Sequence, residues 1–447
     1  MEFMTLQSNI YAVSRGFKQE VICEKEMWHF LAILINSMYV RTSDRDFYWS
    51  YDRDVGIAAI RDLLPRHRFN QIMRSLHFRN NREMPAENPD RYFKVRPLFR
   101  TLNQKLEIFQ NGPKVSVDES MVPYFGYHGC KQYLKGKPHK FGFKMWVAAR
   151  PDGTPLYIEP YCGISTDIPE YGLGKSCHVV AHMITRLGLT PGADVFADNY
   201  FLSPALLKWA VARHIGLTGT IRKNRLGEVP RVELDSDKTY KSVVEKNDQI
   251  IYTTWQDRKV LTVASNHYGC EPLKTVVVGK GEAKKSVEKP ALIVQYNENM
   301  GGVDLMDFFL SVYRQRIRSK KWYFPIFAWT LAVSLLSSWK LWVSHATAAD
   351  TKGRRKGFLY FLRTINWAIR ESVPHQEHRH AERVPIAVEH PVNRRFDEID
   401  HVIFETSKRR ECTHCKENLL AVKRAKYECR KYNVGLHPGC FAEFHGY

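Results

Sequence analysis

The hydrophobic pattern of the chain changes its period near Pro113, which separates a helix-forming segment from a sheet-forming one. Before this point, apolar residues recur every three or four positions through 27–35 and 69–78, as in helices with one buried face. After it come short runs rich in β-branched and aromatic residues, separated by Gly and Pro. The runs at 114–118, 144–149 and 155–161 therefore predict strands.

Strands and helices then alternate along the middle of the chain. The pattern predicts a helix over 177–187, a strand over 194–197 and a helix over 204–214. Strands followed by alternating strand and helix predict an α/β sheet. From about 222 to 290 the chain is polar, with strand-like runs at 249–254 and 259–264. This stretch predicts a β-rich insertion.

The helical period returns after Met300, through 324–342 and 358–369. The first of these runs is apolar, but Lys340 interrupts it and it falls short of the about 20 apolar residues of a membrane span, so a buried core helix is expected. Residues 375–409 are rich in His, Arg, Glu and Pro without periodicity and predict a linker. Neither a secretory signal nor a membrane span is evident in the sequence.

Length and charge narrow the class of protein. A chain of 447 residues is too long for one hydrophobic core, so two to four domains are expected. Its 67 Lys and Arg against 47 Asp and Glu give a net charge of +20, which predicts a polyanionic partner. Nucleic acid is the first candidate. An anionic membrane is disfavoured, because no basic amphipathic helix or lipidation motif is evident. Five scattered cysteines suit reduced thiols in an intracellular protein.

Three acidic residues stand where strands end or a helix begins. Asp118 and Asp198 end predicted strands, and Asp304 lies in GGVDLMD at 301–307, with Asp307 one turn later. Each alone is typical of a turn former or a helix cap. Together, carboxylates far apart in sequence suit a site for two divalent cations acting on a phosphodiester, and Mg²⁺ (or Mn²⁺) prefers such ligands.

At these residues the chain resembles the piggyBac transposase family, from about Phe30 to the C-terminus. The similar stretches are YWS at 48–50, SVDESM at 116–121, KQ at 131–132, KP at 137–138, GFK at 142–144, DNYF at 198–201, GTIRKNR at 219–225, Trp255 with Asp257 and Lys259, GGVDLMD, and KW at 321–322. Several ordered motifs are more specific than one short pattern.

The resemblance implies a function and a mechanism. Asp118, Asp198 and Asp304 would be the catalytic aspartates of an RNase H-like core, with Asp307 as a further Mg²⁺ ligand. The partners would be double-stranded DNA, as transposon ends and TTAA target, and a second copy in a homodimer. A 3′-hydroxyl would cut the opposite strand to form a hairpin, and the same site would join the ends to the target. Two alternatives stay open: a domesticated DNA-binding chromatin protein, and a nuclease without strand transfer.

Basic residues follow the proposed carboxylates, where phosphates would approach. The candidate DNA contacts are Lys131, Lys137, Lys140, Lys144, Arg222, Lys223, Arg225, Arg316, Arg318, Lys320 and Lys321. Tyr124, Tyr127 and Trp255 are candidates for stacking on an unpaired base or, equally, for the core. The basic stretches 352–356 and 408–410 are typical of nuclear localisation signals and predict a nuclear protein.

The last 36 residues hold a cysteine and histidine cluster of zinc-module size. Its candidate Zn²⁺ ligands are Cys412, Cys415, Cys429, His437, Cys440 and His445. We expect Cys412, Cys415 and Cys440 to share one ion with His437 or His445, and Cys429 to join them or anchor a second site. Compared with the family's two-zinc module, Tyr432 stands where a cysteine is usual, and His414 is a possible substitute ligand. A RING-type ligase needs eight ligands and is set aside.

The predicted fold is therefore an α/β RNase H-like catalytic core with a β-rich insertion, a flanking α-helical domain and a small C-terminal zinc module. The boundaries are 1–112 (helical dimerisation and DNA-binding domain, first part), 113–222 (core, first part), 223–290 (insertion), 291–313 (core, second part), 314–374 (helical domain, second part), 375–409 (linker) and 410–447 (zinc module).

Overall fold

The computed structural model divides into two compact units, Met1–Pro374 and His375–Tyr447. It describes the chain except for residues 88–89, 110–111, 136–138, 164–165, 167, 228–233, 235–239, 246–248, 257–258, 279–283, 350–356, 373–400, 402, 419–421, 430–433 and 446–447. The basic stretch 352–356 and the greater part of the predicted linker thus lie outside the described residues.

The first 110 residues form helices, as the apolar period predicts. They are α1 (Glu2–Ser14), α2 (Glu24–Tyr39), α3 (Ala58–Arg61), α4 (Arg66–Ser75) and α5 (Arg96–Leu106), with 3₁₀ turns at Arg45–Trp49, Asn81–Glu83 and Glu107–Phe109. A buried ion pair joins two of them: the Arg68 guanidinium on α4 donates through Nε and Nη2 to the two carboxylate oxygens of Glu26 on α2, at 2.5 and 2.7 Å. A buried, bidentate pair of this kind fixes the relative orientation of the helices.

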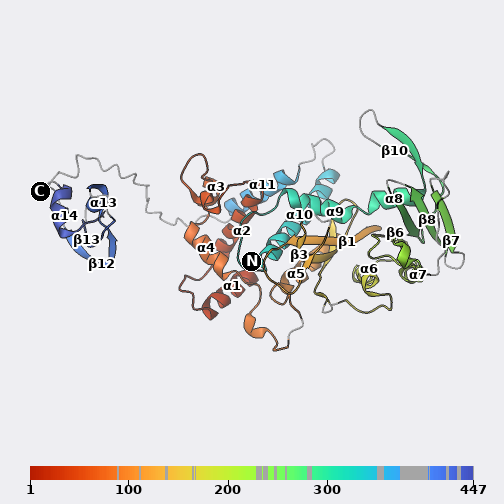
Figure 1. Ribbon diagram of the computed structural model, residues 1–447, viewed down its shortest axis with the longest axis horizontal. Coiled ribbons are helices and arrows are strands. Elements are labelled where there is room, and N and C mark those ends of the chain that lie inside the picture. Colours follow the sequence, from red (N-terminus) through yellow and green to blue (C-terminus); the bar gives the residue numbers. More distant parts are fainter. Residues whose placement is uncertain are drawn as a thin grey trace. The chain divides into compact units, whose positions relative to one another are not determined.

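A nine-stranded mixed sheet forms the centre of the larger unit (Figure 1). Its core strands are β1 (Lys114–Pro123), β2 (Lys131–Tyr133), β3 (Phe141–Ala149), β4 (Pro155–Pro160), β5 (Asp194–Ala197) and β6 (Gly216–Ile221). β3 pairs antiparallel with β1, β2 and β4, whereas β5 runs parallel to both β1 and β6. Antiparallel pairing among β1–β4, followed by the two parallel strands β5 and β6 and covered by helices, is consistent with an RNase H-like core.

Helices cover the sheet, and some of them follow the strands directly in sequence. α6 (Lys175–Arg186) and α7 (Pro204–Val211) lie below β6 in the view of Figure 1, and α9 (Gly302–Val312) lies above β1. α8 (Ala291–Asn299) packs against β1, β6 and β9. The predicted alternation of strand and helix between 177 and 214 is confirmed, because α6, β5 and α7 occupy those positions.

The β-rich stretch continues the same sheet. β7 (Tyr240–Glu245), β8 (Ile250–Gln256) and β9 (Val260–Ser265) follow one another by antiparallel pairing, and β9 pairs with β6. The hairpin of β10 (Lys274–Val278) and β11 (Lys285–Lys289) forms a separate two-stranded sheet. The sheet order is thus β2-β3-β1-β5-β6-β9-β8-β7, with β4 beside β3.

Two late helices complete the larger unit. α10 (Phe324–Ala349) packs against α5, α9 and β1, and α11 (Phe358–Ser372) packs against α2, where Asn366 Nδ2 donates to the Tyr39 hydroxyl at 2.8 Å. By length and composition, residues 324–345 of α10 would suffice to cross a membrane, and half of their apolar window is buried within the protein. Phe324, Ile326 and Leu336 are among the α10 side chains in the main core, as expected for a core helix.

The tail unit contains β12 (Ile403–Glu411), α13 (Thr413–Asn418), β13 (Arg424–Cys429), β14 (Val434–Gly435) and α14 (Pro438–His445). β12 pairs with β13, and β13 with β14, all antiparallel. Its small core includes Cys412, Cys415, Cys429 and Phe444. The sequence places a linker over 375–409, and the structure differs there, because β12 begins at Ile403 and pairs through its backbone with β13.

Candidate catalytic site and metal-binding tail

Asp118 and Asp198 meet where two parallel strands end their pairing. The register of β1 and β5 runs from Lys114 opposite Asp194 to Val117 opposite Ala197. Asp118 and Asp198 are the next residue on each chain. Since adjacent strands lie about 4.8 Å apart, these two aspartates are neighbours just past the point where β1 and β5 stop pairing.

Helix α9 brings Asp304 and Asp307 to the same face of β1. Alternate residues of a strand share a face, so Asp118 points to the same side as Ser116 and Ser120. The Ser120 hydroxyl donates to Asp307 Oδ1 at 2.6 Å. A Cβ built on Gly302 would lie only 2.4 Å from Ser116 Oγ, so α9 begins directly over Ser116. Asp304 lies between these two contact points on α9, over the region of Asp118.

The charges of all three predicted catalytic carboxylates affect the pKa of Tyr296 on α8. Burial raises the pKa of its phenol, and the negative charges of Asp198, Asp118 and Asp304 raise it further. This half-buried tyrosine thus lies within electrostatic reach of residues 118, 198 and 304, which are far apart in sequence.

The carboxylates form an accessible cluster of hard oxygen ligands. Asp304 is exposed, and Asp118, Asp198 and Asp307 are half-buried. Such oxygens are the ligands Mg²⁺ prefers, and partial exposure leaves room for water and substrate phosphate. Among the described residues, two groups of side chains have ligand atoms that all lie within 4.8 Å of one another. The four aspartates belong to neither group, so their oxygens are spread more widely. A pair of ions about 4 Å apart is held by carboxylates spread over a wider area.

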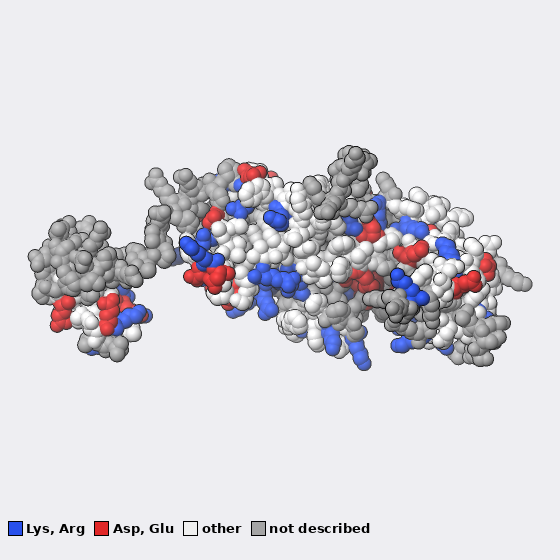
Figure 2. All heavy atoms as spheres, turned by 90° about the horizontal axis from the view of Figure 1, so that it is seen from above, with Lys and Arg blue, Asp and Glu red and all other residues white. Residues whose placement is uncertain are grey.

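Most of the predicted DNA contacts lie on the surface. Figure 2 shows Lys and Arg side chains gathered in separate groups on one face of the larger unit. Those exposed are Lys140, Arg222, Lys223, Arg316, Arg318 and Lys320, with Lys131 half-buried on β2. Arg225 is half-buried and its guanidinium donates to the Tyr200 carbonyl at 2.5 Å, while Lys137 lies outside the described residues.

Two basic loops meet beside the sheet. Arg314 Nη1 lies 3.4 Å from His139 Nε2, which joins the segment after α9 to the loop after β2. Burial lowers the pKa of Arg314, and the charges of Arg316 and Arg318 lower it further. Crowded guanidinium groups of this kind repel one another, and a bound polyanion would relieve that repulsion.

Two other predicted DNA contacts are engaged inside the protein. Lys144 is only 6% exposed; its Nζ lies 3.8 Å from the centroid of the Trp146 ring and 3.8 Å from the Glu119 carboxylate. Lys321 Nζ donates to the carbonyls of Arg74 and Leu76, at 2.7 and 2.9 Å, at the end of α4. These contacts favour a structural role for both lysines over a phosphate contact.

The three candidate stacking aromatics differ in exposure. Trp255 is 3% exposed and belongs to a small core with Leu292 and Ile293. Tyr124 is half-buried and stacks on Phe143, with ring centroids 4.9 Å apart. Only Tyr127, which is 96% exposed, keeps a free ring face for a base among the three.

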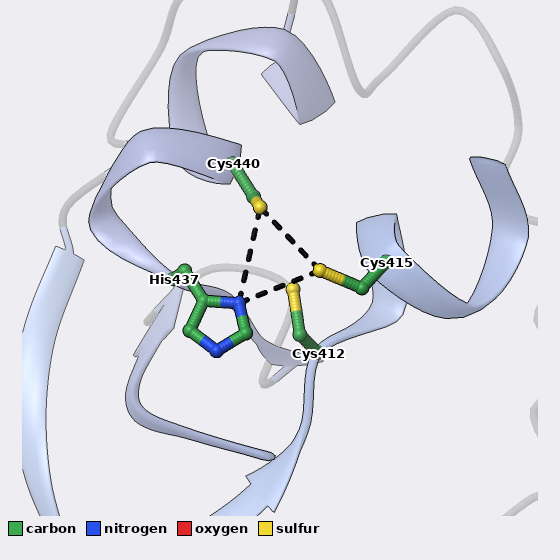
Figure 3. A group of neighbouring side chains, drawn as sticks. All are labelled: Cys412, Cys415, His437 and Cys440. Atoms are coloured by element: carbon green, nitrogen blue, oxygen red, sulfur yellow. Dashed lines mark hydrogen bonds between the residues drawn. The ribbon is translucent and has the colours of Figure 1, made fainter. Parts of the chain in front are cut away.

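Four of the six predicted tail ligands lie close together. Sγ of Cys412, Cys415 and Cys440 and a ring nitrogen of His437 all lie within 4.8 Å of one another (Figure 3). His437 Nδ1 is 3.5 Å from Cys415 Sγ and 3.8 Å from Cys440 Sγ. Burial raises the pKa of the Cys412 thiol, but hydrogen bonds from Cys415 and His437 outweigh it and lower the pKa to about 7. Three sulfurs and one imidazole make a donor set that fits zinc.

A second cluster forms around Cys429. It consists of His401, Cys429 and His445, with Cys429 Sγ 3.8 Å from His401 Nδ1. The sequence did not predict His401 as a ligand, because it lies in the predicted linker. The strand-like run that follows it, now β12, indicates that the folded tail begins earlier than predicted. The possible substitute His414 is engaged elsewhere, with Nε2 2.9 Å from the Glu443 carboxylate. Tyr432 lies outside the described residues.

Comparisons with known proteins identify relatives of this chain. Residues 1–339 match the protein family described as Transposase IS4. The whole chain aligns at 32% identity with PiggyBac transposable element-derived protein 3 of Homo sapiens, over 74% of that protein, and at 29% with PiggyBac transposable element-derived protein 2 of Homo sapiens, again over 74%.

A solved structure shares the fold. It is described as the cryo-EM structure of a piggyBac transposase synaptic complex with hairpin DNA, and it matches with a TM-score of 0.70 at 17% identity, over 98% of this chain and 94% of that one. With the family match over residues 1–339 and the curated relatives, this places the chain in the piggyBac transposase family.

Proposed function

We propose that this protein is a metal-dependent DNA transposase that cuts and joins strands, with cut-and-paste movement at TTAA targets. The observation that carries the proposal is the strand register that sets Asp118 beside Asp198, together with the Ser120–Asp307 hydrogen bond that lays α9, the helix of Asp304, against the same strand. The solved relative with this fold is described as bound to hairpin DNA, which supports a hairpin route for this chain as well.

The chain's own residues prepare the site for phosphoryl transfer. Asp118, Asp198, Asp304 and Asp307 would hold Mg²⁺ or Mn²⁺. When bound, such ions activate a water or a 3′-hydroxyl and neutralise charge on the leaving oxygen. Thr220 and Ser120 hold two of these carboxylates in place by donating to Asp198 Oδ1 at 3.0 Å and to Asp307 Oδ1.

The exposed basic residues supply DNA affinity in this proposal. Arg222 and Lys223 follow β6 beside Asp198, and Arg222 Nε donates to Asn199 at 2.8 Å, which keeps the guanidinium near the site. Arg316, Arg318 and Lys320 form a second exposed row. Such residues position the duplex through its phosphates, so they orient a strand toward the carboxylates.

The tail would be a zinc module. Cys412, Cys415, His437 and Cys440 would hold one Zn²⁺, and His401, Cys429 and His445 would hold a second with a further ligand. By analogy with the family, the module would help recognise transposon ends, the protein would act as a homodimer, and it would work in the nucleus.

A cleavage assay tests the proposed activity. Purified protein is incubated with Mg²⁺ and a plasmid carrying piggyBac-type inverted terminal repeats, and nicks, hairpins and joined products are resolved on gels. We expect Asp118→Asn to abolish all three products while DNA binding, measured by gel shift, changes by less than about threefold, because affinity comes from Lys and Arg. Products from Asp118→Asn equal to wild type would overturn the proposal.

A second candidate function is that of a domesticated DNA-binding protein without transposition. The observation in its favour is that both curated relatives are described as transposable element-derived. The same assay separates the two functions, because a domesticated protein would bind the DNA and give no products with Mg²⁺ or Mn²⁺.

A further inference from the structure

Two hydroxyl groups form a short chain that ends on one of the clustered carboxylates. Thr220 Oγ1 donates to Asp198 Oδ1 at 3.0 Å, and the Tyr296 hydroxyl oxygen lies 3.4 Å from Thr220 Oγ1. Thr220 is placed by the sheet, since β5 and β6 pair in parallel up to Ala197 opposite Gly219 and the next pair is Asp198 and Thr220.

The direction of the hydrogens in this chain follows from counting donors. A threonine hydroxyl has one hydrogen, and Thr220 gives it to the carboxylate. Thr220 Oγ1 must then act as the acceptor toward Tyr296. The phenol is able to donate, because a tyrosine hydroxyl has an ordinary pKa of about 10 and keeps its hydrogen at neutral pH.

Helix α8, which carries Tyr296, packs against β1, β6 and β9 and is tied to β1 by a side-chain hydrogen bond. Gln295, the preceding residue, accepts a hydrogen bond from Lys114 Nζ on β1 at 3.0 Å. Asn299 Nδ2 donates to the Gln295 carbonyl one turn later, at 2.7 Å. A phenol fixed in this way has its position set before any metal or DNA binds, and a carboxylate that binds metal well is itself held by hydrogen bonds.

We propose that Tyr296 is a positioning residue of the carboxylate cluster, which acts through Thr220 to fix the orientation of Asp198. The inference rests on the proposed function, because it assigns Asp198 to a divalent metal site. It adds a residue from α8 to a site otherwise built from β1, β5 and α9, and it gives the Thr220 hydroxyl a defined task.

The test measures Mn²⁺ affinity directly, by isothermal titration calorimetry on the full chain, with Asp198→Asn defining the heat that does not come from this site. We expect Tyr296→Phe and Thr220→Val each to weaken Mn²⁺ binding by about tenfold, the lower end of what loss of such a supporting contact costs. Thr220→Ser keeps the hydroxyl and should bind like wild type. The double variant should lose no more than either single one, because the two groups act in series.

A matched control separates positioning from general stability. The Tyr268 hydroxyl donates to Asp194 Oδ2 at 2.5 Å, at the opposite end of β5 from Asp198. Tyr268→Phe removes a comparable hydroxyl–carboxylate bond from the same strand and should leave Mn²⁺ affinity unchanged. If it weakens Mn²⁺ binding as much as Tyr296→Phe does, the loss is one of stability and the inference is wrong.

The outcomes also distinguish the inference from the function on which it rests. Wild-type Mn²⁺ affinity equal to that of Asp198→Asn would overturn both the metal site and the role of Tyr296. A different result would overturn the inference alone: Tyr296→Phe and Thr220→Val bind Mn²⁺ as wild type does, while Asp198→Asn loses Mn²⁺ binding. The proposed function would then still stand. Additive losses in the double variant would also contradict it.

Discussion

Gly302→Ala should damage the candidate site while its neighbour Gly301→Ala should not. A Cβ at 302 would lie 2.3 Å from the Arg150 carbonyl oxygen and 2.4 Å from Ser116 Oγ, whereas real Cβ atoms essentially never come within 3.0 Å of another heavy atom. The start of α9 must therefore move away from β1 by at least about 0.7 Å. Overpacking of this kind costs about 1–3 kcal/mol.

The displacement matters because Asp304 lies on the first turn of the same helix. A misplacement of about 1 Å in a catalytic constellation costs about 10²-fold in rate, so we expect a loss of that order in strand cleavage by Gly302→Ala. Gly301 is the matched control, since it has a φ of −75° and a Cβ there would meet nothing within 4 Å. Gly301→Ala should keep cleavage within about threefold of wild type, because the substitution introduces no clash.

The assay compares cleavage rate, Mn²⁺ affinity and thermal unfolding for the two variants. Gly302→Ala should remain folded, with a lower melting temperature and weakened Mn²⁺ binding. If both variants cleave equally well, the contact between α9 and β1 does not set the position of Asp304, and the geometric argument is refuted.

Three further predictions concern pH, salt and zinc. His77 is buried, and burial lowers its pKa to about 4 from an ordinary value of 6.5. Below pH 6.5 the unfolded chain therefore binds more protons than the folded one. The free energy of unfolding should fall by about 2 kcal/mol between pH 7 and pH 5. Urea unfolding should show this loss in wild type and a smaller one in His77→Gln, and equal pH dependence in both would contradict it. DNA affinity should fall steeply as the salt concentration rises. Alanine at both Arg316 and Arg318 should reduce the slope of log affinity against log salt concentration by about 2, whereas Lys144→Met should leave this slope unchanged. A flat salt response in wild type would contradict the phosphate contacts. Elemental analysis should find two Zn²⁺ per chain, with His401→Ala removing the weaker one; one ion in wild type, unaffected by that change, would show that the second cluster does not bind zinc.

The sequence carries enough information for the elements that depend on local pattern. β5 occupies the predicted positions 194–197, and α10 and α11 begin at the predicted residues, because apolar period and flanking breakers are local properties. Asp118 and Asp198 are neighbours because they follow paired positions of two parallel strands, β1 and β5. The alternation of strand and helix in the sequence already indicates such a parallel pair.

Other features depend on contacts that no local pattern reports. β1 extends to Pro123, beyond the predicted end at 118, because β3 pairs with it from Ser116 to Pro123. β7 to β9 join the core sheet through β9 and β6, a long-range pairing. Lys144 belongs to a basic run in the sequence, yet its ammonium lies over the Trp146 ring, two residues along the same face of β3.

The central claim is that Asp118, Asp198 and Asp304 hold the metal ions that act on DNA. A crystal structure of the protein with DNA and Mn²⁺, with the ions located by anomalous scattering, tests it most directly. We predict ions bound by oxygens of all three carboxylates, at roughly the 2.0–2.1 Å that Mg²⁺ adopts. Ions bound elsewhere in the core, with these three aspartates uncoordinated, would contradict the account.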